Sequence, residues 1–285
     1  MTIPSQHRAV HAPLAALGYL LTGILILLAL PIQALLFVLT APFDRNRAIA
    51  GRFSRLVAVA VTKTYPPWRL RVEGRWPGKG PYVVVANHQS LLDILMLSKL
   101  PREMKWIAKE ELFRVPWVGW MFRISGDIPV KRGDAESGGE ALAKARRYLA
   151  NGMNVMIFPE GTRSKTAKLL PFKSGAFRLA IEAGVPILPI AVNGSAAGMP
   201  KGSPWVRPCD AVAKILEPVP STGYKPEEAA RLRDVVRDRI AAALPAAVPV
   251  ESAAADQPQP AGSGRTVSEA ARPPSASTRS APPTR

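Results

Sequence analysis

The most constraining feature of this chain is an uncharged apolar stretch near its N-terminus. No Asp, Glu, Lys or Arg occurs between Arg8 and Asp44, and residues 14–30 and 32–43 are almost wholly apolar. About 20 apolar residues suffice for a helix to cross a bilayer, and no small-residue cleavage site marks the stretch as a signal peptide. Pro31 divides it and predicts either one kinked membrane-embedded helix or a shallow helical hairpin within one leaflet. A buried helix of a soluble core is the remaining alternative.

The charge of the chain points to an anionic partner. It has 38 Lys and Arg against 21 Asp and Glu, a formal net charge of +17, which suits nucleic acid or anionic lipid. The flank after the apolar stretch is basic and carries Arg45, Arg47, Arg52, Arg55, Lys63, Arg69, Arg71 and Arg75. By the positive-inside rule this flank faces the cytoplasm. Because no zinc finger or aromatic RNA-binding signature accompanies the charge, we predict membrane lipids as partners and no nucleic acid.

A second feature is a strand pattern followed by a polar connection and a helix pattern. The apolar β-branched residues 82–86 predict a buried strand, and residues 91–97 predict a mostly buried helix. Ser90 and Asp93 have the spacing of a capping box at the start of that helix. This places His88 on the connection and Asp93 on the first helical turn, from which its carboxylate can reach back to the imidazole.

Such a pair has a specific chemistry. A carboxylate on one imidazole nitrogen fixes the tautomer, and the other nitrogen becomes a base for an incoming hydroxyl. Of the three histidines, His7 and His11 precede the apolar segment, which leaves His88 as the imidazole of the predicted folded body. The structural alternative is that Ser90 and Asp93 merely cap a helix, a contribution of about 1 kcal/mol.

A polar loop with the sequence Phe-Pro-Glu-Gly-Thr-Arg-Ser occupies residues 158–164, directly after another apolar strand pattern. Gly161 allows close backbone approach, Thr162 offers a hydroxyl, and the guanidinium of Arg163 matches phosphate oxygens. The loop therefore predicts an anion site. The alternative is that Glu160 and Arg163 simply pair with each other.

Two further segments bear on this prediction. A short strand pattern over residues 126–132 contains Pro129, which favours a sheet edge, and ends in Lys131 and Arg132, which enlarge the predicted positive pocket together with Lys173. The single Cys209 allows no disulfide within the chain and belongs to no Cys/His cluster, so we predict no metal site.

Three blocks together resemble the glycerolipid acyltransferases, and most of all their 1-acylglycerol-3-phosphate (lysophosphatidate) type. They are Asn87-His88 with Asp93, the loop 158–164, and Val185-Pro-Ile-Leu-Pro189. The resemblance runs over roughly residues 81–192. A lone His-x4-Asp pattern would be a weak signal, but its combination with Glu-Gly-Thr-Arg in this order is specific.

The resemblance implies an enzyme that moves a fatty acyl group from acyl-CoA or acyl carrier protein to a lysophospholipid acceptor. The acceptor group is the sn-2 hydroxyl of 1-acylglycerol 3-phosphate, and the product is phosphatidic acid for phospholipid synthesis. It implies no cofactor and no acyl-enzyme. Another lyso-lipid acceptor, such as lyso-ornithine lipid, is the alternative among enzymes, and a non-catalytic membrane lipid-binding protein is the alternative outside them.

The resemblance also implies roles for particular residues. His88 is the general base and Asp93 orients it. Asn87 or backbone N–H groups are candidates for stabilising the oxyanion. The implied substrate-binding residues are Glu160, Gly161, Thr162, Arg163, Arg132 and Lys131.

Strand and helix patterns alternate, which predicts an α/β fold with a mixed, mostly parallel sheet flanked by helices and a site at the strand C-termini. We divide the chain into a membrane-embedded segment (1–43), a basic amphipathic connector (44–80), an acyltransferase domain (81–244) and a disordered Pro/Ala/Ser/Arg tail (245–285). Within the domain, the Trp-rich and Lys-rich residues 104–122 fit either core packing or a surface at the lipid headgroup level.

Overall fold

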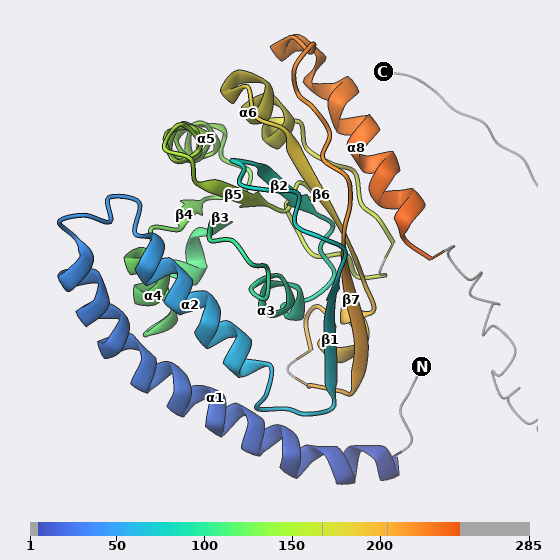
Figure 1. Cartoon of the computed structure of the whole chain (residues 1–285). Coiled ribbons are helices and arrows are strands. Elements are labelled where there is room, and N and C mark those ends of the chain that lie inside the picture. The colour runs from blue at the N-terminus through green and yellow to red at the C-terminus, as the bar shows by residue number, and fades with distance from the viewer. Residues whose placement is uncertain (1–4, 167, 204, 246–285) are drawn as a thin grey trace, which may run out of the picture. The chain divides into compact units, whose positions relative to one another are not determined.

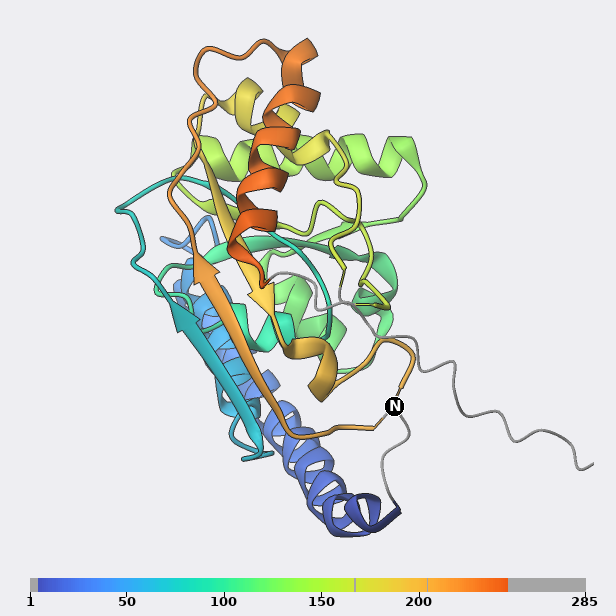
Figure 2. The same cartoon turned by 90° about the vertical axis from the view of Figure 1, so that its right-hand side faces the viewer.

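A seven-stranded sheet forms the centre of the computed structural model, which describes residues 5–166, 168–203 and 205–245 (Figure 1). Its strands are β1 (Trp68–Glu73), β2 (Val83–Ala86), β3 (Met104–Lys109), β4 (Ile128–Val130), β5 (Asn154–Ile157), β6 (Ile187–Asn193) and β7 (Cys209–Ile215). The spatial order is β1-β7-β6-β2-β5-β3-β4, and of these pairs β6 with β7 is antiparallel. This confirms the predicted mixed, mostly parallel sheet. Figure 2 shows β1 and β7 side by side at one edge, and Pro129 lies in β4 at the other.

Helices cover both faces of the sheet. They are α1 (Ser5–Thr40), α2 (Ala48–Val61), α3 (Leu92–Leu97), α4 (Val118–Ser125), α5 (Ala135–Ala150), α6 (Gly175–Ala183), α7 (Ser195–Gly198) and α8 (Ala229–Ala243), with short 3-10 helices η1 (Glu110–Arg114) and η2 (Pro226–Glu228). In Figure 1, α5, α6 and α8 lie on one side of the sheet, whereas α3, α2 and α1 follow one another on the other side.

The alternation of side chains along β2 explains these two layers. Val83 and Val85 point into the core shared with α5, α6 and α8, while Val84 and Ala86 point into the core shared with α3. All of these side chains are fully buried, and each buried valine contributes about 1.5–3 kcal/mol through the apolar area removed from water. β2 is therefore central, and the connection after it emerges in the middle of the sheet edge.

The apolar N-terminal stretch forms one continuous helix rather than a hairpin divided at Pro31. Helix α1 has 36 residues and passes through Pro31, which removes a single backbone donor from an otherwise regular helix. The chain turns back only at residues 41–47, where both carboxylate oxygens of Asp44 accept backbone N–H groups at the start of α2. A helical pair does exist, but its partners are α1 and α2.

Gln33 fixes α1 to the rest of the fold. Its side chain is fully buried, and its Nε2 lies 2.8 Å from Ser54 Oγ on α2 and 2.9 Å from Ser125 Oγ on α4. A buried amide in apolar surroundings is costly unless it is hydrogen-bonded, so these contacts specify how α1 docks. The outer side of α1 remains exposed and apolar, and its residues Ala12–Thr40, with mean hydropathy 2.5, are long and apolar enough to cross a membrane by length and composition.

One arginine of the basic flank is buried in the fold. Arg55 is 4% exposed, and its Nη2 lies 2.6 Å from both carboxylate oxygens of Asp127. Its guanidinium also lies over the Trp106 ring, so an aromatic face and a carboxylate together compensate for its burial. The expected connector 44–80 further contributes β1 to the sheet, and the expected tail lies, from residue 246 onward, outside the described residues.

The segment 104–122 contains a strand that the sequence pattern did not reveal. Its Lys105 breaks the apolar alternation of β3, yet this lysine is fully buried and its Nζ donates to the carbonyl oxygens of Arg47 and Ser125. Trp106 is buried in the core, whereas Trp117 and Trp120 are 44% and 53% exposed. Core packing and surface exposure therefore each describe part of this segment.

Candidate active site

The two polar loops meet because the strands before them are neighbours. β2 and β5 are parallel, with Val85 beside Ile157 in the register, so the residues that follow both strands emerge at the same edge. The imidazole of His88 stacks on the ring of Phe158, with centroids 3.9 Å apart and planes 15° apart. Phe158 was not among the predicted site residues, because this contact depends on the strand register.

Asp93 binds the imidazole and caps the helix at the same time. Its Oδ2 lies 2.7 Å from His88 Nδ1 and accepts the backbone N–H groups of Gln89 and Ser90 at 2.7 and 2.9 Å. Ser90 Oγ accepts the backbone N–H of Leu92, as expected for the cap, although α3 begins only at Leu92. His88 and Asp93 are both buried. The motif therefore fixes the local backbone and also holds the imidazole through Nδ1, the geometry that the predicted general base requires; its role in catalysis stays a prediction.

The loop 158–164 holds the backbone of His88 on both sides. Glu160 Oε1 accepts the His88 backbone N–H at 2.9 Å, and the Ser164 N–H donates to the His88 carbonyl oxygen at 2.8 Å. Glu160 is buried. Among the described residues no ion pair joins Glu160 to Arg163, so the alternative that these two side chains neutralise each other is not realised.

Burial gives Glu160 an unusual titration. Removal from water raises the pKa of its carboxyl from 4.5 to about 7, and the negative charge of Asp93 acts in the same direction. The backbone N–H groups of His88 and Leu170 and the charge of Arg237 oppose this rise. The carboxyl is thus poised to change charge near neutral pH.

We expect Glu160 to make the protein less stable as the pH rises toward neutrality. The unfolded chain releases this proton near pH 4.5, whereas the folded chain keeps it until about pH 7, so the unfolded state binds fewer protons in that window and stability falls. In Glu160→Gln this dependence should be absent. The unfolding free energy of the variant relative to wild type should rise by about 3 kcal/mol between pH 4.5 and 8, as measured by chemical denaturation. An unchanged difference across this range would contradict the assigned titration.

A basic cavity lies beside the two loops. Its volume is about 370 Å³, and its lining includes Lys131, Arg132, Phe158, Gly161 and Lys173. Of the predicted site residues, Lys131, Arg132 and Gly161 thus line one cavity. Lys131 is mostly exposed and its Nζ lies 3.3 Å from the Asp134 carboxylate, which makes it the least available cation of the group.

Arg132 and Arg163 lie close enough to influence each other. Partial burial lowers the pKa of Arg132, and the positive charge of Arg163 lowers it further, against the opposing charge of Glu111. In the described part of the chain, neither guanidinium has a carboxylate within 4.0 Å. Two neighbouring like charges, neither of them held in an ion pair, favour an anionic ligand.

Lys201 supports the Thr162–Arg163 turn and was missed by the sequence analysis. Its Nζ lies 2.8 Å from Thr162 Oγ1 and 3.0 Å from the Arg163 carbonyl oxygen. The lysine belongs to the connection between α7 and β7, far away in sequence. No local pattern in the sequence signals such a contact.

The side chain of Asn87 is engaged elsewhere. Its Nδ2 donates to the Val192 carbonyl oxygen at 2.8 Å, and its Oδ1 accepts the Val192 N–H at 2.7 Å. Both hydrogen bonds attach the connection after β2 to β6. One N–H of the Asn87 amide is therefore used within the fold, and the choice between Asn87 and backbone N–H groups as oxyanion donors stays open.

An apolar cavity of about 270 Å³ lies between the N-terminal helices and the site. Residues of α1, α2, α3 and α4 line it, and Leu91 and Leu92 connect its wall to the segment that carries His88 and Asp93. Its size and lining suit a hydrocarbon chain rather than a polar ligand.

Comparison with known proteins agrees with this geometry. The Acyltransferase family model matches residues 69–193. A 1-acyl-sn-glycerol-3-phosphate acyltransferase of Chlamydomonas reinhardtii is 37% identical over 77% of this chain and 67% of its own length. The chloroplastic enzyme BAT2 of Brassica napus, of the same name, is 36% identical over 77% of this chain and 63% of its own. The chain thus spans about two thirds of these relatives.

A solved structure has the same fold. The 1-acyl-sn-glycerophosphate acyltransferase PlsC of Thermotoga maritima superimposes with a TM-score of 0.66 at 29% identity, over 83% of this chain and 96% of that one. Fold and site together define an acyltransferase enzyme. More narrowly, the chain belongs to the glycerolipid acyltransferase family, in its 1-acylglycerol-3-phosphate acyltransferase group.

Proposed function

We propose that this enzyme transfers a fatty acyl group from acyl-CoA or acyl carrier protein to the sn-2 hydroxyl of 1-acylglycerol 3-phosphate, which gives phosphatidic acid. The observation that carries the proposal is the convergence of a base and an anion site. Asp93 Oδ2 lies 2.7 Å from His88 Nδ1, and the His88 imidazole stacks on Phe158. Phe158 also lines the basic cavity. A hydroxyl acceptor with a phosphate nearby fits both features.

The reaction is a direct transfer. Because Asp93 holds Nδ1 of His88, the other ring nitrogen takes the proton of the acceptor hydroxyl as its oxygen attacks the thioester carbonyl carbon. The carbon–sulfur bond breaks, and the imidazolium returns the proton to the departing thiolate. Asp93 stabilises the imidazolium between these steps. Such general-base catalysis contributes about 10² to 10⁴ in rate, so positioning of the two substrates supplies much of the remainder.

Within this mechanism, Glu160 and Phe158 act by positioning His88 rather than by binding the acceptor. The contact of Glu160 is with the backbone of His88, and that of Phe158 is with the imidazole face. Acceptor binding then falls mainly to Arg163 and Arg132, whose guanidinium groups lack carboxylate partners in the described structure. Their planar forks match the oxygens of a phosphate.

The protein is seated on the cytoplasmic face of the cell membrane through α1. Support comes from its exposed apolar side chains, which include Leu20, Leu28, Leu35 and Leu39, and from the basic flank that follows. Gln33 anchors the helix to α2 and α4. The apolar cavity beside α1 then receives an acyl chain directly from the lipid phase.

A panel of acceptors tests the proposed function. Purified protein is given one labelled acyl-CoA, or the matching acyl carrier protein, with 1-acylglycerol 3-phosphate, monoacylglycerol or lyso-ornithine lipid. We expect labelled phosphatidic acid as the main product, because only the first acceptor places a phosphate beside its free hydroxyl. Preferential acylation of lyso-ornithine lipid would assign the alternative acceptor, and binding without transfer to any acceptor would exclude an enzyme.

A further inference from the structure

The segment before α4 has an unusual backbone. Trp117 has φ 64° and ψ −59°, and the N–H of Val118 donates to the Pro116 carbonyl oxygen at 2.7 Å. This is a γ-turn of the rare form, and positive φ is unfavourable for a bulky side chain. Such a conformation is strained and persists where the surroundings enforce it, most often at functional sites.

The surroundings do enforce the turn. The N–H of Gly119 donates to the Val115 carbonyl oxygen at 2.8 Å, and a Cβ atom on Gly119 would collide with the carbonyl oxygen of Phe113. The close approach of α4 to η1 therefore requires glycine at this position. As a result Trp117 projects from the fold and pairs edge-on with Trp120, with ring centroids 5.4 Å apart.

The exposed pair continues a helix face that is buried against α1. Met121 and Ile124 of α4 pack with Leu25, Ile26, Ala29 and Leu30 of α1. Trp120 stands four residues before Ile124 and so lies on the same side of α4, whereas Trp117 lies just before the helix and contacts Trp120 edge-on. The apolar face thus runs from the contact with α1 outward to the two tryptophans, without a charged residue in these rows.

The same segment borders the apolar cavity. Val118 and Phe122 line it on the α4 side, Tyr19 lines it on the α1 side, and Leu91 leads toward the site. The cavity therefore adjoins both the exposed apolar helix α1 and the helix α4, at whose start the two exposed tryptophans stand. Tryptophan rings favour the lipid headgroup level, where their amphipathic rings have both an apolar and a polar neighbour.

We propose that Trp117 and Trp120 form a second lipid-contacting element, opposite α1, so that the cavity opens into the bilayer between two membrane contacts. The proposal rests on the proposed membrane seating of α1 and assigns phospholipid as the partner of this surface. It gives the strained turn a role, because the turn is what exposes Trp117.

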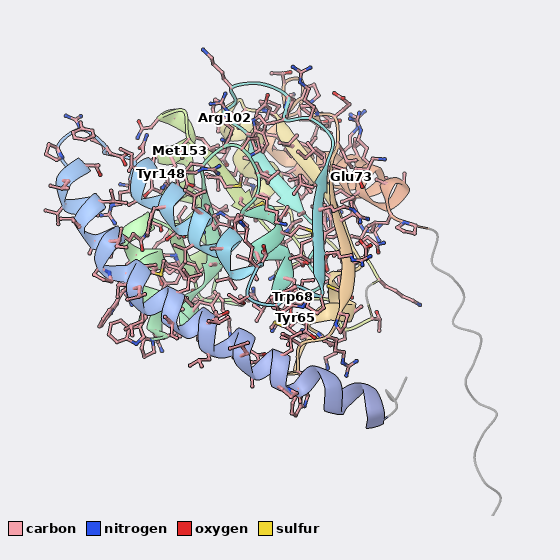
Figure 3. The ribbon with its side chains drawn as sticks, turned by 60° about the horizontal axis from the view of Figure 1, so that its bottom comes forward. Tyr65, Trp68, Glu73, Arg102, Tyr148 and Met153 are labelled. Carbon is pink, nitrogen blue, oxygen red and sulfur yellow. The ribbon has the colours of Figure 1, made fainter. Side chains whose placement is uncertain are left out.

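Fluorescence quenching by lipid tests this directly. The full chain is mixed with vesicles of phosphatidylethanolamine and phosphatidylglycerol whose acyl chains are brominated near the headgroup. We expect tryptophan emission to fall on binding and the double variant Trp117→Phe/Trp120→Phe to lose most of that quenching. Trp76→Phe is the matched control, because Trp76 follows Glu73, at the end of β1 remote from α1, whereas Trp68 lies next to α1 (Figure 3).

A second variant measures the contribution to binding. With both tryptophans replaced by Ala, partition into unbrominated vesicles of the same lipids should weaken roughly tenfold or more, because apolar area is lost. The melting temperature is the folding control.

If the wild type does not bind vesicles at all, the proposed membrane seating of α1 is wrong and this inference is wrong with it. If it binds but quenching and partition survive both double variants, the tryptophan contact alone is wrong. A concentration-dependent oligomer in lipid-free buffer that the Ala variant abolishes would assign the surface to a second copy of the chain and overturn the lipid assignment.

Discussion

The variant His88→Ala is expected to lose acyl transfer almost completely. It removes the nitrogen that takes the acceptor proton, and general-base catalysis contributes about 10² to 10⁴ in rate. The loss should appear in kcat, with little change in the KM of the lysophospholipid, because His88 acts in the transition state rather than in phosphate binding. Steady-state kinetics with labelled acyl-CoA measure both quantities.

Two controls separate catalysis from folding in this experiment. The imidazole stacks on Phe158 and binds Asp93, so the melting temperature of His88→Ala must be compared with that of the wild type. His7→Ala replaces a histidine that precedes the apolar stretch in the sequence and should leave turnover unchanged. Wild-type turnover in a folded His88→Ala protein would eliminate the proposed mechanism.

The second large effect is expected for Arg163→Ala, in acceptor binding. A charge-assisted hydrogen bond contributes about 1.5–3 kcal/mol, so the KM for 1-acylglycerol 3-phosphate should rise roughly ten- to a hundredfold. The KM of the acyl donor should change little. Arg163→Lys should recover only part of the loss, because an ammonium group cannot reproduce the planar fork.

The specificity of this effect decides its interpretation. Lys165→Ala, two residues further along the same loop, is the matched loss of one positive charge and should leave the acceptor KM near the wild-type value. Monoacylglycerol, which lacks the phosphate, should be used equally well by wild type and Arg163→Ala. If the variant weakens both acceptors alike, the Arg163 side chain supports the shape of the loop and does not bind phosphate.

Much of the site could be predicted because its residues follow apolar strands. The residues 82–86 before His88 and 155–157 before Phe158 are continuously apolar, which is the pattern of strands buried on both faces. Their polar ends must then lie at one sheet edge. The amphipathic pattern of the connector 44–80 is that of a helix, and α2 occupies Ala48–Val61 within it. The capping spacing predicted that Asp93 would reach His88.

The remainder depends on contacts between distant residues. β3 escaped prediction because Lys105 interrupts its apolar pattern, and only the fold supplies the carbonyl groups that satisfy its ammonium. Pro31 suggested a division of α1, but packing against α2 keeps the helix continuous. Glu160 was predicted to bind the substrate, whereas the register of β2 and β5 places its carboxylate against the backbone N–H of His88.

The central claim is direct attack by a hydroxyl that His88 activates, and rapid-quench single turnover tests it most directly. Excess enzyme is mixed with acyl-CoA labelled in the acyl chain, with and without 1-acylglycerol 3-phosphate, and label is followed in protein, phosphatidic acid and donor. The account predicts no label on the denatured protein at any time, and free CoA and phosphatidic acid that appear with one rate constant only when the acceptor is present. A burst of CoA ahead of the product, with label retained on the protein, would contradict it.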